Sequence, residues 1–339
     1  MFLRDLVSWW QLIFFLKPTR NKDIKFHKEI LLLWPMTESK KIQPPFLKKG
    51  DEVGIISPSF FIDENLLAEA VVFLGKWGLK VRVGRNASKR KGPFAGSDEE
   101  RLSDLQEMTD DPEIKAVLCS RGGYGLSKII DRIDFSSLIK NPKWYTGFSD
   151  ITVLHLWLNE VCGIMSVHGE MPLNFNNTEK TSETLSSLKK ALFGEPVFYE
   201  WVGPVYRPAD VTAELTGGNL SLLFSLKGTK ADPVTSGKIL FIEDVGEHYY
   251  HIDRMMTSFK LSGHLEDLSA LVVGGMNKIT DIKIPWGKSI EETILDIVSE
   301  YDYPVIFNFP AGHIKDNRAI YIGREANIEI SGNKIVLWQ

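Results

Sequence analysis

Short apolar runs alternate with segments of helical periodicity along the first half of the chain. The apolar runs are rich in β-formers, which is typical of buried strands, and stand at residues 53–57, 79–83, 114–120, 143–148 and 164–167. Apolar residues recur at helical spacing in the segments 64–77, 97–108, 125–133 and 150–161. Ser97 and Glu100 have the spacing of a capping box. The alternation predicts an α/β fold with a parallel sheet and helices on both of its faces.

The second half is richer in strands. Strands are expected at residues 209–215, 238–243, 268–273, 305–309, 319–322, 327–330 and 334–338, with helices from Leu220 and at 249–261 and 290–298. The run Thr216-Gly217-Gly218-Asn219 is interpreted as a turn. We therefore predict four parts: an extension at 1–43, an α/β domain at 44–175, a linker at 176–208 and a smaller β-rich domain at 209–339.

The first forty residues lie outside this pattern. Residues 7–16 form an apolar run flanked by Arg4 and Lys17, too short to span a bilayer. No small-residue cleavage site follows it. The segment could be an interfacial membrane anchor, an uncleaved signal-like segment, or an extension before a translation start at Met36. We prefer the last interpretation, because the organised pattern begins only near Phe46, and we expect no stable membrane association.

Composition excludes several function classes. The chain has 339 residues, of which 43% are hydrophobic and 25% charged, as in soluble globular proteins. The net charge of -4 gives no electrostatic footprint for nucleic acid. Both cysteines, Cys119 and Cys162, stand in apolar runs, so we expect buried thiols rather than a disulfide, which suits a reducing compartment.

Ser149 stands where a strand pattern gives way to a helical one. Residues 143–148 are β-rich, and helical spacing begins at Ile151. Such a turn exposes a serine hydroxyl, and the helix N-terminus behind it favours developing negative charge. The second glycine of the common esterase elbow is missing, however. The alternative is that Ser149 or Asp150 merely caps the helix.

A glycine-rich loop, Arg121-Gly122-Gly123-Tyr124-Gly125, joins an earlier strand to the next helical segment. Its glycines would let backbone N–H groups approach a phosphate or an oxyanion. It is neither a Walker loop nor a dinucleotide fingerprint, and it could be only a tight turn. In parallel sheets ligands bind beyond the carboxyl ends of the strands, where Ser57, Arg121 and Ser149 all fall.

Two further residues could complete a catalytic triad. Glu243 ends an apolar strand, and His313 directly follows another. With Ser149 they give the chain order Ser, Glu, His, although a triad is recognised by geometry rather than order. His248 and His251 are a conceivable metal pair near Glu247, but no third ligand has useful spacing, so we expect no metal.

Seven motifs together closely resemble the LD-carboxypeptidase family of serine peptidases over residues 44–338. The motifs are Ser57-Pro58-Ser59, Arg121-Gly122-Gly123-Tyr124-Gly125, Gly147-Phe148-Ser149-Asp150, Thr216-Gly217-Gly218-Asn219-Leu220, Glu243-Asp244, Ile252-Asp253-Arg254 and Gly312-His313. The resemblance implies an N-terminal α/β domain, a β-rich C-terminal domain and a site between them. It also implies a cytoplasmic, cofactor-free homodimer that cuts the bond before the terminal D-alanine of murein tetrapeptides.

The resemblance assigns roles residue by residue. It implies that Ser149 is the nucleophile, that Glu243 and His313 complete the triad, and that the backbone N–H groups of Gly123 (or Gly122) and Asp150 form the oxyanion hole. Substrate contacts are expected from Arg121, Gly122, Asn219 and Arg254.

Either of those two arginines would bind the terminal carboxylate of the substrate, the alternative being a structural ion pair. The chain departs from the family in its first forty residues. It also departs at Glu170, where a His-Gly-Pro-Met pattern would have proline.

Two rival functions stay open at this point. Some family members cleave peptidyl-nucleotide antibiotics and confer self-immunity, which requires an aromatic platform; Trp201, Tyr206 or Trp286 could supply one. A non-catalytic muropeptide-binding module is the other, and the intact set of Ser149 and its two partners argues against it.

Overall fold

Five parallel strands form most of the first sheet. The computed structural model describes residues 41–177 and 179–339. The parallel strands are β1 (Glu52–Ile56), β2 (Lys80–Val83), β3 (Ile114–Cys119), β4 (Trp144–Gly147) and β5 (Ser166–His168). Their helices are α3 (Glu64–Lys76), α4 (Asp98–Asp110), α5 (Ser136–Lys140), α6 (Thr152–Leu156) and α7 (Ser182–Phe193). The predicted parallel sheet with alternating helices is confirmed, and so is the Ser97–Glu100 capping box.

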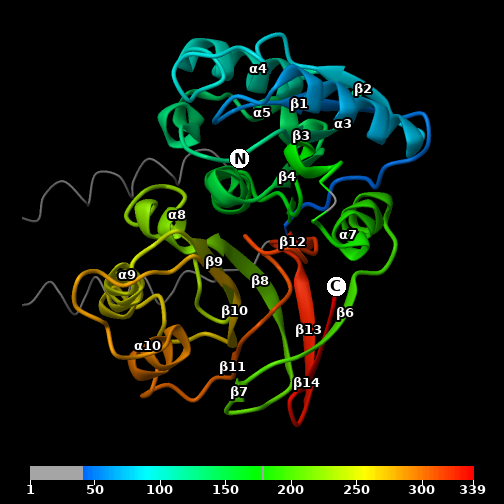
Figure 1. The fold of residues 1–339 in the computed structure, drawn as a ribbon. Coiled ribbons are helices and arrows are strands. Elements are labelled where there is room, and N and C mark those ends of the chain that lie inside the picture. The colour runs from blue at the N-terminus through cyan, green and yellow to red at the C-terminus, as the bar shows by residue number, and fades with distance from the viewer. Residues whose placement is uncertain (1–40, 178) are drawn as a thin grey trace, which may run out of the picture. The chain divides into compact units, whose positions relative to one another are not determined.

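The second sheet has eight strands in the order β6-β14-β13-β8-β9-β10-β11-β7 (Figure 1). These are β6 (Phe198–Val202), β7 (Val205–Tyr206), β8 (Val211–Asn219), β9 (Ile239–Val245), β10 (Ala270–Asn277), β11 (Val305–Ile306), β13 (Glu325–Ser331) and β14 (Lys334–Trp338). The helices α8 (Leu220–Ser225), α9 (Tyr249–Leu261) and α10 (Ile290–Ile297) gather on one side of it (Figure 1). Strands β8 to β11 run parallel, so this region is also mixed α/β.

One strand from the end of the chain crosses to the first sheet. β12 (Ile320–Ile322) pairs antiparallel with β5, with Ile320 opposite His168. In Figure 1, β12 lies between the two sheets and near α7. The segment 307–319, which we call the His313 loop, therefore runs from β11 in the second sheet to β12 in the first. Sequence pattern predicted this strand but could not reveal its partner.

Two buried hydrophobic clusters each contain side chains from both sheets. In β9, Leu240 and Ile242 belong to one cluster, whereas Ile239 and Phe241 belong to the other. This follows from the alternation of side chains across a strand. The two sheets therefore share their cores, which fixes the relative position of residues at their strand ends.

Some predicted elements differ in detail. The helix expected at 125–133 is two short 3-10 turns, η1 (Leu126–Lys128) and η2 (Ile130–Arg132), because Ile129 between them has a non-helical φ of -127°. The helix expected at 150–161 is a 3-10 turn η3 (Ser149–Ile151), α6 and a π turn η4 (Trp157–Val161). Its periodicity predicted a helical segment but neither its hydrogen-bonding type nor its burial, because all residues at 151–156 are buried whereas Val161 is 43% exposed.

The glycine pair before α8 is part of a strand and not a turn. β8 continues through Gly217 and Gly218, which pair with Phe241 and Ile242 of β9. Pairing with β9 extends the strand to Asn219 and decides the conformation against the local turn signal.

The boundaries of the predicted parts stay a prediction, although several contacts bear on them. The segment expected to be a linker forms α7, β6 and β7, and the two strands are the outer strands of the second sheet. Most of the predicted extension lies outside the described residues. Its last part contacts the fold: the Ile42 N–H donates to the Gly163 carbonyl at 2.7 Å, and Lys41 forms ion pairs with Glu160 and Glu214.

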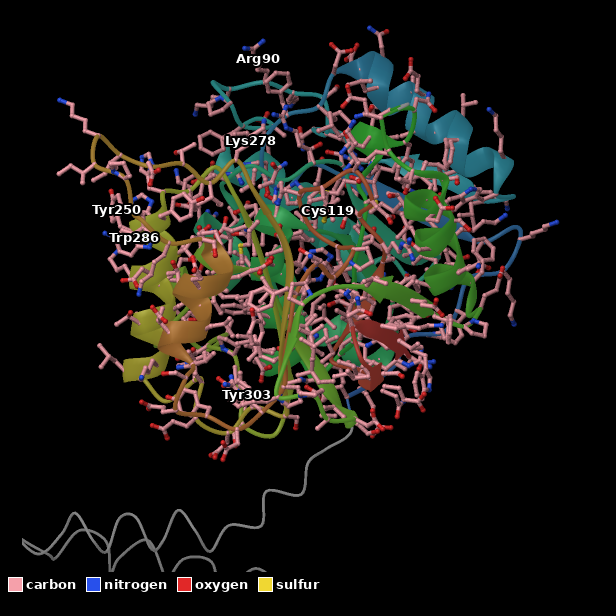
Figure 2. All side chains as sticks on the ribbon, turned by 60° about the horizontal axis from the view of Figure 1, so that its bottom comes forward. Arg90, Cys119, Tyr250, Lys278, Trp286 and Tyr303 are labelled. Carbon is pink, nitrogen blue, oxygen red and sulfur yellow. The ribbon has the colours of Figure 1, made fainter. Side chains whose placement is uncertain are left out.

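Both cysteines are free thiols, as expected. Cys119 is fully buried in the interior (Figure 2), and Cys162 is half-buried. None of the helices formed by the described residues combines the length and the apolar content that a bilayer span requires.

Candidate active site

Ser149 occupies a strained strand-to-helix turn at the end of β4. Phe148 is extended, and Ser149 then adopts a φ of 64° as the first residue of the η3 turn, which leads into α6. A positive φ is uncommon for a residue other than glycine, and such strain clusters at functional sites. The turn has the form of a nucleophile elbow, which raises a serine side chain above the sheet edge.

The structure does not support a capping role for Ser149 or Asp150. A capping side chain accepts a hydrogen bond from a backbone N–H of the first helical turn. Neither η3 nor α6 has such a bond at its N-terminus. The backbone strain at Ser149 therefore lacks a capping explanation.

Asp150 instead connects three segments around the elbow. Its carboxylate accepts hydrogen bonds from the Ser59 hydroxyl at 2.5 Å and from the Leu126 N–H at 3.0 Å. The side chain is fully buried, and burial raises the pKa of Asp150 while both hydrogen bonds oppose that rise. Because a buried donor without a partner costs about 1–3 kcal/mol, this carboxylate holds the loop after β1 and the glycine-rich loop against the elbow.

The glycine-rich loop lies against Ser149 itself. A Cβ atom at Gly122 would stand 2.8 Å from the Ser149 Cβ and 3.0 Å from its Oγ, so a side chain there would displace Ser149. Arg101 connects the glycine-rich loop to the loop after β1. Its guanidinium donates to the carbonyl oxygens of Pro58 and Gly125 at 2.5 and 2.9 Å. Our sequence analysis missed Arg101. Arg101 precedes the buried Leu105 by four positions and follows Ser97 by four. Because residues four apart lie on the same face of a helix, this spacing indicates that Arg101 is on the buried face of α4.

The two predicted oxyanion donors open into one cleft. Gly123 and Asp150 both line a cleft of about 890 Å³, together with Tyr124, Trp157 and Lys230. Asp150 is the second residue of the η3 turn, where backbone N–H groups have no partner within the turn. The role of these two amides as oxyanion donors stays a prediction, since Ser149 is not among the described residues that line this cleft.

Glu243 in β9 and His313 in the His313 loop form a hydrogen-bonded pair. Glu243 is fully buried in β9, and its Oε2 accepts from the His313 backbone N–H at 3.1 Å and contacts the ring Nδ1 at 2.7 Å. This contact orients the ring and leaves Nε2 as the nitrogen available for proton transfer. The residues are 70 positions apart and meet because the His313 loop passes the end of β9.

Phe148 connects this pair to the turn at Ser149. The His313 ring packs edge-on against the Phe148 ring, with the centroids 4.8 Å apart, and Phe148 directly precedes Ser149. Within the described residues, the Ser149 hydroxyl forms no hydrogen bond to the His313 ring. Catalytic hydrogen bonds are often long in the free enzyme and shorten when substrate binds.

The predicted substrate-binding residues have different surroundings. Arg121 donates to the Phe61 carbonyl at 3.2 Å, and Arg254 lies over the Tyr250 ring at 5.6 Å. Among the described residues neither arginine forms an ion pair, so the structural alternative has no support there. Asn219 accepts from the Leu222 N–H at the start of α8 and donates to Asp244, which gives its side chain a local structural role.

The remaining histidines do not form a metal centre in the described part of the chain, where no three metal-ligating side chains gather. His248 contacts Thr280, and His251 contacts Glu247. His168 is fully buried between the rings of Phe148 and Phe241.

Two family models match the chain. The model described as LD-carboxypeptidase N-terminal domain matches residues 53–169, and the one described as LD-carboxypeptidase C-terminal domain matches residues 212–328. The first match contains the elbow and the glycine-rich loop, and the second contains Glu243 and His313.

Curated relatives cover most of the chain. A protein of Bacillus subtilis named "Probable murein peptide carboxypeptidase" is 37% identical, over 88% of this chain and 95% of that protein. A Pseudomonas aeruginosa protein named "Murein tetrapeptide carboxypeptidase" is 30% identical, over 84% of this chain and 94% of that protein.

Solved structures share the fold. The muramoyltetrapeptide carboxypeptidase of Oxalobacter formigenes is 30% identical with a TM-score of 0.77, over 85% of this chain and 98% of that one. The microcin C7 self-immunity protein MccF, solved with aspartyl sulfamoyl adenosine, is 21% identical with a TM-score of 0.79, over 88% of this chain and 98% of that one. At that identity the likeness to MccF shows the fold alone.

Proposed function

Because the chain belongs to the LD-carboxypeptidase family of serine peptidases, we propose that it removes the terminal D-alanine from murein tetrapeptides during cytoplasmic peptidoglycan recycling. Ser149, His313 and Glu243 are its proposed catalytic triad. The observation that carries this proposal is the position of the Glu243-bound His313 ring against Phe148, next to the strained Ser149. The names of the Bacillus and Pseudomonas relatives support the substrate.

The first chemical step forms an acyl-enzyme. His313 Nε2 takes the proton of the Ser149 hydroxyl, and Oγ attacks the carbonyl carbon before the terminal D-alanine. The oxyanion accepts hydrogen bonds from the Gly123 and Asp150 amides, and one such donor contributes about 3 kcal/mol to the rate. As the C–N bond breaks, His313 returns its proton to the departing amine. Glu243 stabilises the imidazolium that exists between these transfers.

The second step releases the shortened peptide. Water enters after D-alanine leaves, His313 takes one of its protons, and the resulting hydroxide attacks the ester carbon. The ester bond breaks, and the Ser149 oxygen recovers its proton from His313. No metal or cofactor takes part, since every proton and electron pair is accounted for by these groups.

The cleft beside the oxyanion amides supports a peptide substrate with a free end. Its lining includes Lys230 and Asp131 as well as Gly123 and Asp150, so a polar peptide finds partners of both charges. The D-configuration matters because the methyl group and the carboxylate of the leaving residue exchange places in an L-residue. The polar groups of the site would then lose their partners, which can produce large discrimination.

A second candidate function has one observation in its favour. Tyr124 and Trp157 also line the cleft, and aromatic rings of this kind could stack on a nucleobase. Trp201, Tyr206 and Trp286, the aromatic residues suggested by the sequence, are absent from the described lining of this cleft. Trp286 lies at the periphery of the molecule (Figure 2). Cleavage of an acyl-nucleotide is therefore the alternative to test.

The test is mass spectrometry of a murein tetrapeptide incubated with the protein. We expect loss of one alanine residue, appearance of free D-alanine, and no product from Ser149→Ala. An analogue with terminal L-alanine should stay intact, and an acyl sulfamoyl adenosine should be cleaved more slowly than the tetrapeptide. Faster cleavage of the nucleotide would favour the second candidate. Absence of both products, together with no acylation by a fluorophosphonate probe, would leave a binding module as the function.

A further inference from the structure

The His313 loop is held from two sides, and only one of them is the Glu243 side. On that side Glu243 accepts from the His313 backbone and contacts its ring, while the Asn277 amide donates to the His313 carbonyl at 2.9 Å. On the other side the loop faces Glu170 and Lys180, which come from the segment between β5 and α7.

Glu170 is a fully buried carboxylate with a complete set of donors. Its Oε2 lies 2.8 Å from the Lys180 Nζ and 3.5 Å from the Asn317 amide nitrogen. Its Oε1 accepts from the Met171 N–H at 3.0 Å and from the Asn174 amide at 2.9 Å. The pair that it forms with Lys180 is therefore a built ion pair and not a surface contact.

Two of the Glu170 partners bind backbone groups on either side of His313, and one of them, Asn317, is itself part of the His313 loop. Lys180 Nζ donates to the Ile314 carbonyl at 2.9 Å, directly after His313. The Asn317 amide oxygen accepts from the Gly312 N–H at 2.8 Å, directly before it.

Lys180 also reaches the nucleophile side. Its Nζ stands 6.0 Å from the centre of the Phe148 ring, on which the His313 ring packs. The Glu170 carboxylate thus contacts both side chains that bind next to His313, and one of them, Lys180, also lies near Phe148.

We propose that the Glu170–Lys180 pair positions His313 for proton transfer, as a second device beside Glu243; this inference rests on the proposed function of His313. A buried ion pair adds little net stability compared with apolar residues of the same size, because both charges lose their hydration. The geometry is set instead by the Lys180 bond to the Ile314 carbonyl after the base and by the bond of Asn317 to the Gly312 N–H before it, since Glu170 contacts both of these side chains. A displacement of about 1 Å in a catalytic group costs on the order of 100-fold in rate.

The test compares this pair with a matched pair elsewhere. Lys238 and Glu214 are also 2.8 Å apart, and the Lys238 side chain is 12% exposed, as is that of Lys180. Lys238 directly precedes β9, whereas Glu243 lies five positions further along, about 16 Å at the usual strand rise. Lys238→Met therefore removes an equally buried lysine from an ion pair without touching the His313 loop, although its partner Glu214 is 28% exposed and keeps its contact with Lys41.

Three measurements distinguish an effect on the position of His313 from an effect on the stability of the fold. They are made on Glu170→Gln, Lys180→Met, Lys180→Arg and Lys238→Met. They are the urea midpoint, the rate of Ser149 acylation by a fluorophosphonate, and kcat and KM for D-alanine release. We expect Glu170→Gln and Lys180→Met to lower the acylation rate and kcat by about 10- to 100-fold and to change KM by less than about twofold. Lys180→Arg, which keeps the charge and the donors, should recover most of the rate.

Lys238→Met is expected to lose stability while keeping its acylation rate within about twofold of wild type. The double variant Glu170→Gln with Lys180→Met leaves no unpaired buried charge, so it should fold even if Lys180→Met does not. It should still react slowly. Acylation of the double variant at the wild-type rate would overturn the proposal, as would an equal rate loss in Lys238→Met.

The probe keeps this result separate from the substrate proposal. A wild-type protein that is acylated but releases no D-alanine contradicts only the proposed substrate, and the variants still report on positioning. A wild-type protein that is not acylated contradicts the nucleophile assignment and the positioning proposal together.

Discussion

The two regions of the protein place their proposed catalytic residues in different ways, although in each region a buried aspartate follows one of these residues in sequence. In the N-terminal region Ser149 is followed by Asp150, and in the C-terminal region Glu243 is followed by Asp244; both aspartates are buried. Asp150 holds neighbouring loops around a strained backbone turn. Asp244 accepts from Asn219 and from the Ser221 N–H, and so fixes the start of α8 beside Glu243.

The two regions differ in the kind of contact that fixes the positions of these residues. The position of the proposed nucleophile comes from a strained backbone turn at Ser149, which Asp150 and Gly122 hold against the neighbouring loops. The position of the base comes from side-chain contacts between β9, the His313 loop and the segment before α7, which are far apart in sequence. We therefore expect the base side to be sensitive to remote substitutions and the nucleophile side to be sensitive mainly to local ones.

The largest effect is expected from Ser149→Ala. Removing the hydroxyl removes the acyl-enzyme, so D-alanine release should fall on the order of 10⁴-fold or more. The stability should stay close to wild type or rise, since the strained residue loses no hydrogen bond found in the described residues. Steady-state kinetics and urea unfolding measure the two quantities. A residual rate within about tenfold of wild type would show that Ser149 is not the nucleophile.

Glu243→Ala should cost less activity than Ser149→Ala. The carboxylate orients His313 and stabilises its charged form, but it does not react itself. By comparison with another serine peptidase triad, the loss should be roughly 10- to 100-fold smaller than the loss of the nucleophile. The kcat of D-alanine release measures it. An unchanged kcat would mean that the 2.7 Å contact between Glu243 and His313 has no role in catalysis.

The buried carboxyl group of Asp244, next in sequence to Glu243, should make the free energy of unfolding depend on pH. Burial, with a contribution from the nearby Glu243 charge, raises the pKa of Asp244 from 3.8 to about 7. Its hydrogen bonds from Val245 and Asn219 favour the charged form, but they are outweighed. The folded state holds the Asp244 proton more tightly than the unfolded state does. The contribution of this protonated carboxyl group to the free energy of unfolding is therefore complete below about pH 4 and is lost as the pH rises through about 7.

The matched variant is Asp244→Asn, which cannot ionise. The free energy of unfolding of wild type minus that of the variant should fall by up to about 4 kcal/mol between pH 4 and pH 8. Urea unfolding at several pH values tests this. A difference that rises with pH would show that the hydrogen bonds dominate and that the carboxylate is charged in the folded protein.

The smallest effect concerns the start of the chain, where Lys41 connects the two regions. It pairs with Glu160, which follows the elbow helix, and with Glu214 of β8. A protein starting at Met36 should keep its melting temperature and turnover. One starting at Gln43 should lose on the order of 1–3 kcal/mol, because Lys238 alone must then compensate both acids. Thermal melts compare the two, and inactivity of the longer form would contradict the interpretation of the extension.

Much of the nucleophile side could be predicted from the sequence. A β-rich run, a break and a helical pattern are consecutive there, so the elbow at Ser149 follows from neighbouring residues. The strand that carries Glu243 could be predicted for the same reason, although β9 continues beyond Glu243 to Val245. His313 does not directly follow a strand as expected, because β11 ends at Ile306. The positive φ of Ser149 could not, because backbone strain is imposed by surrounding contacts such as those of Asp150 and Gly122.

Long-range pairing explains most of what was missed. Nothing near residues 320–322 indicates that this strand joins β5 rather than the second sheet. The Gly217-Gly218 pair has the composition of a turn, yet its pairing with β9 makes it a strand. Glu170 was noticed only as a departure from a family pattern, since its partner Lys180 lies in a polar segment without periodicity.

The central claim is that Ser149 from one region and His313 from the other act on the same proton, and a double-mutant cycle tests it most directly. Acylation and D-alanine release are measured for Ser149→Ala, His313→Ala and the double variant. If the account is right, adding His313→Ala to Ser149→Ala lowers the residual rate by less than about threefold, because the base has no nucleophile left to serve. Losses that simply multiply would contradict the assignment of His313 as the base.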